Sequence, residues 1–150
     1  MKQTILLTLF LSVFALAEED NKATYLMFED DYMSNDISLF EPWLNEDYKL
    51  VQTLNVPGMG SDTRVASRSQ LISAMKSMRS PNSIPRSSRK DTNIEIISDS
   101  AFCGSSHVFN ETFVGGKNYE EKEIRRVCFS KIEGTYRVTS HNVDVHYREI

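Results

Sequence analysis

Cysteine is scarce in this sequence, with two residues in a chain of 150. Two cysteines allow at most one internal disulfide, which excludes a small scaffold stapled by several bridges. The length is ordinary for one domain with one core. We therefore expect the fold to be held mainly by burial of apolar side chains.

Excess positive charge and established catalytic motifs are also lacking. The chain has 17 Lys and Arg residues against 21 Asp and Glu residues, a net charge of −4, which argues against a general nucleic-acid binder. It contains no GxSxG, HExxH, CxxC, phosphate-loop or dinucleotide-binding motif. We therefore assign no catalytic residue, no metal and no cofactor.

Long apolar runs are absent except at the N-terminus. The segment from Thr4 to Leu16 is nearly all apolar, follows Lys2, and is too short to span a bilayer. Ala15-Leu16-Ala17 fits the small-x-small cleavage rule, and an acidic run follows at once. The sequence predicts a signal peptide over 1–17 and a single secreted, extracellular domain over 18–150, with no membrane attachment after cleavage. An uncleaved anchor is the alternative.

The chain after this segment begins with helical periodicity. Over residues 21–35, Tyr25, Phe28 and Tyr32 recur at the spacing of one helix face. The acidic run Glu29-Asp30-Asp31 is interleaved with them, and we expect it to face water. This segment is predicted to be a helix.

Two further helices are predicted. Asp36 can cap a short second helix, which Pro42 makes short or irregular. Ser67 can cap a third helix, which carries a regular apolar stripe: Leu71, Met75 and Met78. A strand over 49–54 and a Gly- and Pro-containing loop over 57–61 are predicted between these helices.

Residues 79–91 read as a linker rich in Ser, Arg and Pro, because Pro81 and Pro85 disfavour continuous helix or a central strand. The linker carries a basic patch: Arg79, Arg86, Arg89 and Lys90. Such a patch can bind sulfated glycans or phosphate, but a solvated loop is the default expectation.

From residue 92 onward the pattern changes to β. Three turn signals, at Ser98-Asp99, Gly115-Gly116 and Glu133-Gly134, divide this half into four strands joined by hairpins. Together with the earlier strand over 49–54, they form a mostly antiparallel sheet with about three helices on one face. The predicted fold class is α+β.

The second turn fixes a register that can be checked against the cysteines. Cys103 lies twelve residues before Gly115, and Cys128 lies twelve residues after Gly116, so a hairpin turning there places the two cysteines opposite each other. Opposed antiparallel positions lie within disulfide range. The sequence therefore predicts a Cys103–Cys128 disulfide, with two free thiols as the alternative.

The same register assigns faces to the strands. Phe129 aligns with Val138 across the third turn, on the core face, and the cysteines lie on the opposite face. Val143 and Val145 have the other parity from Val138, which a β-bulge between Thr139 and Asn142 repairs. Asn110 is the candidate glycosylation site, in the sequon Asn110-Glu111-Thr112, although strict parity directs it to the core face.

This organisation resembles nuclear transport factor 2-like and SnoaL-like domains over about residues 22–147. The resemblance rests on Asn35-Asp36 before Leu39-Phe40, on the helix after Ser67, on Ser98-Asp99-Ser100-Ala101, and on the run from Glu133 to Val138. It implies a curved sheet that forms a cone with the helices around a central pocket. A signal peptide followed by this domain is also similar to small secreted nematode members of the family.

The resemblance leaves function open, because some members of this family are isomerases, dehydratases or cyclases and others only bind ligands or proteins. His141, Asp144 and His146 lie on one predicted strand, where period 2 separates His141 from the other two, so the three cannot form one metal site without a bulge. Asp144 with His146 can act as a general base and its orienting partner, but a solvated strand end is the preferred interpretation.

Aromatic residues are the candidate ligand-pocket residues: Phe28, Tyr32, Trp43, Phe129 and Tyr136. They suit an apolar ligand with one polar group, or they simply fill the core. The leading hypothesis is a secreted, non-catalytic module that binds an apolar small molecule or a protein partner, including a second copy through the sheet. The alternative is a cofactor-free isomerase, dehydratase or hydrolase with an acid or base in the pocket.

The mature protein is expected to begin at Glu18, because the cleavage rule is met at Ala17 and the next residues are acidic. N-terminal sequencing of the protein from the culture medium of secreting cells checks this. Secreted material that retains Met1 would show that the N-terminal segment is an anchor or a structural helix instead.

Overall fold

The computed structural model describes the backbone of residues 2–34, 36–77, 88–114 and 116–150, and the side chains of these residues from Ala17 onward except Val114. The elements within these residues are α1 (Lys2–Met33), α2 (Ile37–Phe40), the 3-10 helix η1 (Glu41–Trp43), β1 (Lys49–Val56), β2 (Gly60–Ser67), α3 (Arg68–Ser77), β3 (Ser88–Ser98), β4 (Ala101–Val114), β5 (Lys117–Ile132) and β6 (Thr135–Glu149).

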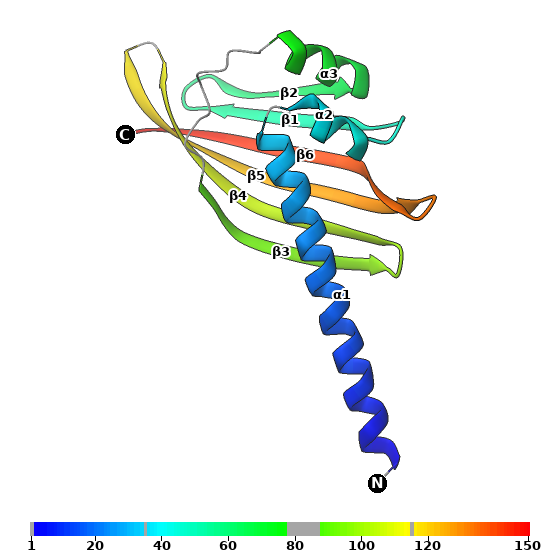
Figure 1. The fold of residues 1–150 in the computed structure, drawn as a ribbon. Coiled ribbons are helices and arrows are strands. Elements are labelled where there is room, and N and C mark those ends of the chain that lie inside the picture. Colours follow the sequence, from blue (N-terminus) through cyan, green and yellow to red (C-terminus); the bar gives the residue numbers. More distant parts are fainter. Residues whose placement is uncertain (1, 35, 78–87, 115) are drawn as a thin grey trace.

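In the described residues, six strands form one sheet in the order β2-β1-β6-β5-β4-β3. Neighbouring strands are antiparallel except β1 and β6, which are parallel. The helices lie on one face of the twisted sheet, and α1 crosses it diagonally (Figure 1). The predicted α+β class and the four-stranded meander are confirmed.

The strand β2 was not expected from the sequence, which predicts a loop over 57–61 and no second strand between that loop and the third helix. Its eight residues pair with β1 along its whole length. Most of its side chains are exposed, because β2 is an edge strand with little apolar surface to bury. A strand without apolar alternation gives no signal in the sequence.

The first half of α1 extends beyond the sheet (Figure 1). Among the described side chains of this helix, the first buried one is Asn21. Among the described side chains of α1, packing against the domain begins downstream of the predicted cleavage point, and the signal peptide remains a prediction. None of the described helices combines the length and apolar character that crossing a membrane requires.

The predicted helix boundaries follow from local hydrogen bonds. The Asp36 carboxylate accepts from the Ser38 backbone N–H at 2.9 Å and caps α2. Pro42 lies in η1, which ends this short helical stretch. At the start of α3, the Ser67 backbone N–H donates to Gln70 and the Gln70 N–H donates to the Ser67 hydroxyl, a reciprocal capping box. Met78, the last residue of the predicted stripe, lies outside the described residues.

The predicted register is confirmed across both long hairpins. Cys103 pairs with Cys128 and the two form a disulfide, on the face of the sheet away from the helices. Phe129 pairs with Val138, whereas Cys128 pairs with Ser140, so Thr139 is the extra residue of a β-bulge. The bulge lies at one end of the predicted interval and returns His141, Val143 and Val145 to the core face.

Close packing of α1 on the sheet depends on Gly104 of β4. A Cβ added to Gly104 would lie 2.1 Å from Cδ2 of the Tyr25 ring. The ring therefore rests directly on the backbone of the strand, where its hydroxyl donates to the Ser106 hydroxyl at 2.7 Å. Tyr25 is fully buried and makes an edge contact with Phe129.

We expect Gly104→Ala to destabilise the fold by about 2 kcal/mol, because the added methyl group overlaps the Tyr25 ring and α1 must shift away from the sheet. Denaturant unfolding measures the change. Gly116→Ala is the control: no atom lies within 4 Å of its added Cβ, so it meets only the backbone strain of its positive φ. A smaller loss for Gly104→Ala than for Gly116→Ala would contradict this account of the packing.

Candidate functional site

The five candidate pocket aromatics come together on the inner side of the sheet, but they pack against one another. Phe28 contacts Tyr32, Trp43 and Phe129 with ring centroids 6.2, 5.8 and 5.4 Å apart. Tyr136 joins the group through Phe102, which it meets edge-on at 5.1 Å. Phe28 and Phe129 lie in the core, and Tyr32, Trp43 and Tyr136 are partly buried and pack against it.

Polar edges of two of these rings are also engaged. The Trp43 indole N–H donates to the Asp31 carboxylate at 2.7 Å, and the Tyr136 hydroxyl donates to the Asn21 side chain at 3.1 Å. Three surface hollows, of about 490, 660 and 430 Å³, are lined by described residues, and none of the five aromatics lines any of them. The ligand pocket therefore remains a sequence prediction.

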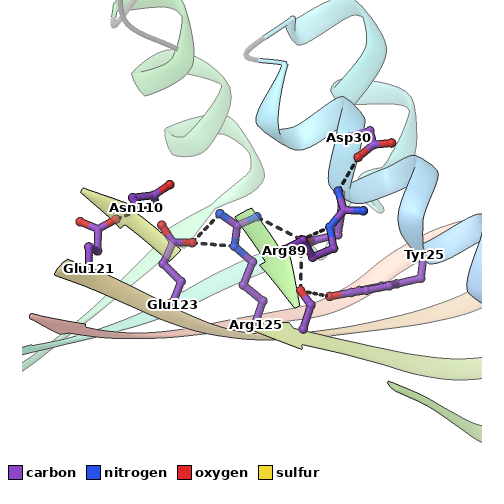
Figure 2. Close-up of polar contacts among 9 residues, drawn as sticks. Tyr25, Asp30, Arg89, Asn110, Glu121, Glu123 and Arg125 are labelled. Atoms are coloured by element: carbon purple, nitrogen blue, oxygen red, sulfur yellow. Dashed lines mark hydrogen bonds and ion pairs between the residues drawn. The ribbon is translucent and has the colours of Figure 1, made fainter. Parts of the chain in front are cut away.

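A buried polar network, which the sequence did not predict, lies beside these rings. Glu29 of α1 is fully buried, and its Oε2 accepts from Arg125 Nη1 at 3.1 Å and from the Ser106 hydroxyl at 3.3 Å. Arg125 of β5 also donates to Glu123 at 2.6 Å (Figure 2). The expectation that Glu29 faces water was wrong. It follows Tyr25 by four residues, so it lies on the same buried stripe of the helix.

Arg89 lies at the start of β3, within the predicted basic linker, and its side chain contacts carboxylates of α1. It forms an ion pair with Asp30, and its Nε lies 3.8 Å from the Glu29 carboxylate (Figure 2). The Arg89 side chain is only 17% exposed. For Arg89 the default interpretation as part of a solvated loop was wrong, because two α1 carboxylates compensate its charge. Arg79 and Arg86 lie outside the described residues.

A second buried polar pair lies on the core face of β6. The Tyr48 hydroxyl and His141 Nδ1 share a hydrogen bond at 2.8 Å, and His141 is fully buried against the Phe28 and Tyr32 rings. Burial, together with the Arg125 charge, lowers the pKa of His141 to about 3, so the imidazole is neutral at physiological pH. Burial also raises the pKa of Tyr32 to about 12.

The remaining sequence candidates lie apart from this network. Asp144 and His146 share the outer face of β6 and are exposed, as the parity argument predicted. Within the described part of the chain, no group of three His, Cys, Asp or Glu side chains could hold a metal ion. Asn110 is half-buried on β4, and its Nδ2 donates to Glu121 at 3.0 Å, so its glycosylation remains a prediction.

The network can anchor α1 to the sheet, and it leaves Glu29 Oε1 and Arg89 Nε without a hydrogen-bond partner. Burial raises the pKa of Glu123, although the Arg125 charge opposes this shift. Glu29 Oε1 and His141 Nε2 have no hydrogen-bond partner. A carboxylate oxygen and an imidazole nitrogen are the groups that acid–base catalysis uses, but both residues are fully buried here.

One feature of the sequence, a charged residue at a core position of a strand, indicated the network, but it did not identify the partner. Arg125 has the same parity as Val127 and Phe129, so it belongs to the core face of β5. A charged residue at a core position needs a partner of opposite charge. Only the crossing of α1 over the sheet identifies that partner as Glu29.

Stability of the protein is expected to fall between pH 7.5 and pH 5 because of His141. The unfolded imidazole binds a proton below about pH 6.5, whereas the folded one stays neutral until about pH 3. The unfolded state therefore binds more protons in this range, which costs about 2 kcal/mol by pH 5. His141→Gln, which keeps a polar side chain beside Tyr48, should remove this pH dependence in urea unfolding measured from pH 7.5 to 5. Parallel curves for both proteins would contradict the assignment.

Comparison with known proteins finds no matching family model and no similar curated sequence. Solved structures match over most of the chain. A hexachlorocyclohexane dehydrochlorinase, LinA-type3 from Novosphingobium barchaimii LL02, has a TM-score of 0.62 at 10% identity, over 91% of this chain and 94% of that one. An NTF-2 like protein of unknown function from Shewanella oneidensis MR-1 has a TM-score of 0.59 at 13% identity, over 84% and 98%. A ketosteroid isomerase-like protein from Erwinia carotovora atroseptica SCRI1043 has a TM-score of 0.55 at 10% identity, over 82% and 91%. The chain has the nuclear transport factor 2-like fold.

Proposed function

We propose that this chain is a secreted, non-catalytic binding module that engages a protein partner on its surface. The observation that carries the proposal is the packing of Phe28, Trp43 and Phe129 against one another on the inner side of the sheet. An apolar ligand between these rings would have to displace side chains that already fill the space. Of the two kinds of occupant expected from the sequence, a protein partner agrees better with this packing.

The state of the buried polar groups supports a non-catalytic role. A general acid or base must reach its substrate and exchange protons at working pH. Glu29 is fully buried and paired with Arg125, and His141 is fully buried with a pKa of about 3. Asp144 and His146 are exposed on the outer face of β6, where no pocket excludes water from them.

The alternative is a cofactor-free isomerase, dehydratase or hydrolase. It is favoured by the unpartnered Glu29 Oε1 and His141 Nε2, and by structural neighbours whose names include a dehydrochlorinase and a ketosteroid isomerase-like protein. This alternative needs a movement of α1 or of the aromatic side chains that admits a substrate to these two atoms. Secretion, and kinship with small secreted nematode proteins, rest on the signal peptide and belong to the proposal in either case.

The outer face of the sheet is the surface we propose for the partner, and a second copy of the chain is the partner. Six strands at about 4.8 Å spacing, with about eight residues each at 3.4 Å, give roughly 800 Å², which is what one side of a standard interface buries. On β1 and β2 most residues of this face are uncharged, with Val51 paired to Val65 and Thr53 paired to Thr63, and Lys49 lies at its end. Val65 is 58% exposed.

Two ion pairs lie on the other half of this face. Arg126 pairs with Glu95, and Arg148 pairs with Glu120. Because these charges are compensated within one chain, they can form the polar rim of an interface without a charged partner. The uncharged residues around Val65 then supply the apolar contacts.

The secreted protein is expected to be a dimer at about 50 μM in sedimentation velocity, and Val65→Asp should weaken the dimer at least tenfold, because it buries an unpaired charge. Met27→Asp is the matched control, since Met27 is 57% exposed but lies on α1, on the opposite side of the sheet. A monomeric native protein, or equal weakening by both substitutions, would contradict the proposed surface.

A further inference from the structure

A hollow of about 490 Å³ lies beside the hairpin that joins β5 to β6, and no residue of α1 lines it. Three elements wall it. Pro42, Leu44 and Asn45 come from η1 and the residues after it, Arg68 from the start of α3, and Ile132 and Arg137 from the β5–β6 hairpin. We call it the Arg137 hollow.

Backbone contacts hold these elements in place. Leu44 forms a parallel bridge with Val138, and the Asn45 N–H donates to the Val138 carbonyl at 3.4 Å, which places Asn45 beside Arg137. The Arg68 N–H donates to the Tyr48 carbonyl at 3.2 Å, and its guanidinium donates to Glu41 at 2.8 Å. The walls of the hollow are therefore fixed by the fold before any ligand binds.

The Arg137 hollow contains hydrogen-bond donors that the protein does not use. In the described part of the chain, the Arg137 guanidinium forms no ion pair and no hydrogen bond, although the residue is half-buried. The Asn45 side-chain amide is half-buried and equally unengaged. A half-buried guanidinium without a partner gains from binding an oxyanion, because charge-assisted hydrogen bonds are stronger where water is partly excluded.

The charge balance of the lining selects the kind of oxyanion. Glu41 is paired with Arg68, and the exposed Glu46 also lines the hollow, so two carboxylates offset the two guanidinium groups. A neutral lining does not favour a multiply charged phosphate. Pro42 and Ile132 add apolar surface, and Ile132 is 37% exposed. The combination suits a single carboxylate attached to an apolar group.

We propose that the Arg137 hollow binds a monocarboxylate with an apolar body. Arg137 and the Asn45 amide donate to the carboxylate, and Pro42 and Ile132 contact the apolar part. The site is separate from the interior network of Glu29 and His141 and from the outer sheet face around Val65. If this site does not bind such a ligand, the proposed function is unaffected, and if it does, the proposed function is not thereby established.

Three probes test the site with the secreted protein in an NMR titration: N-acetyl-leucine, its C-terminal amide, and N-acetyl-glycine. N-acetyl-leucine should bind with a Kd on the order of 1 mM, as expected for a ligand of this size. The amide lacks the carboxylate and the glycine compound lacks the apolar side chain, so each should bind at least tenfold more weakly. Equal affinity for N-acetyl-leucine and its amide, or no binding at 20 mM, overturns the proposal.

Two variants locate the binding. Arg137→Gln should weaken N-acetyl-leucine binding at least tenfold, whereas Arg64→Gln should leave it unchanged, because Arg64 lies on β2, is exposed, pairs with Asp62 and does not line the hollow. Circular dichroism checks that both variants fold. If Arg137→Gln does not fold, Asn45→Ala takes its place, with a severalfold loss expected. Unchanged binding in the folded variant overturns the assignment of the site.

Discussion

The ion pair between Glu29 of α1 and Arg125 of β5 is the interaction on which the arrangement of this domain depends. Both groups are almost completely excluded from water, so each would carry a large desolvation cost without the other. The pair fixes which face of α1 meets the sheet, and Ser106 and Tyr25 extend the same network to β4. Removing one partner would strand a buried charge, which costs about 3–5 kcal/mol.

The bulge at Thr139 determines which side chains of β6 face the inner side of the sheet. Without it, Val143 and Val145 would point away from the helices, and His141 would lie on the outer face with Asp144 and His146 turned inward. One extra residue thus decides that a neutral, fully buried histidine occupies the core and that an exposed Asp and His occupy the surface. The bulge therefore decides which acid–base side chains of β6 face the core and which face the surface.

The packed inner side of the sheet differs from the Arg137 hollow and the outer sheet face in how readily it could bind a partner. The inner side of the sheet is occupied by rings that contact one another at 5.4–6.1 Å, and its charges are paired. Outside it, the guanidinium of Arg137 is unengaged and Val65 of β2 is exposed. In such a fold, binding at the surface requires no reorganisation of the core, whereas catalysis inside it requires one.

The sequence by itself determined whatever depends on neighbours along the chain or on turn geometry. The helix caps at Asp36 and Ser67, the hairpin that joins Cys103 to Cys128, and the alignment of Phe129 with Val138 follow from local hydrogen bonding and from the two-residue period of a strand. The tertiary structure alone decided the pairing of β2, whose exposed residues carry no periodic signal, and the partners of Glu29, Arg89 and His141. These partners are 59 to 96 residues apart in sequence. A charge at a core position indicates only that a partner is needed. Which partner it meets is set by the crossing of α1 over the sheet.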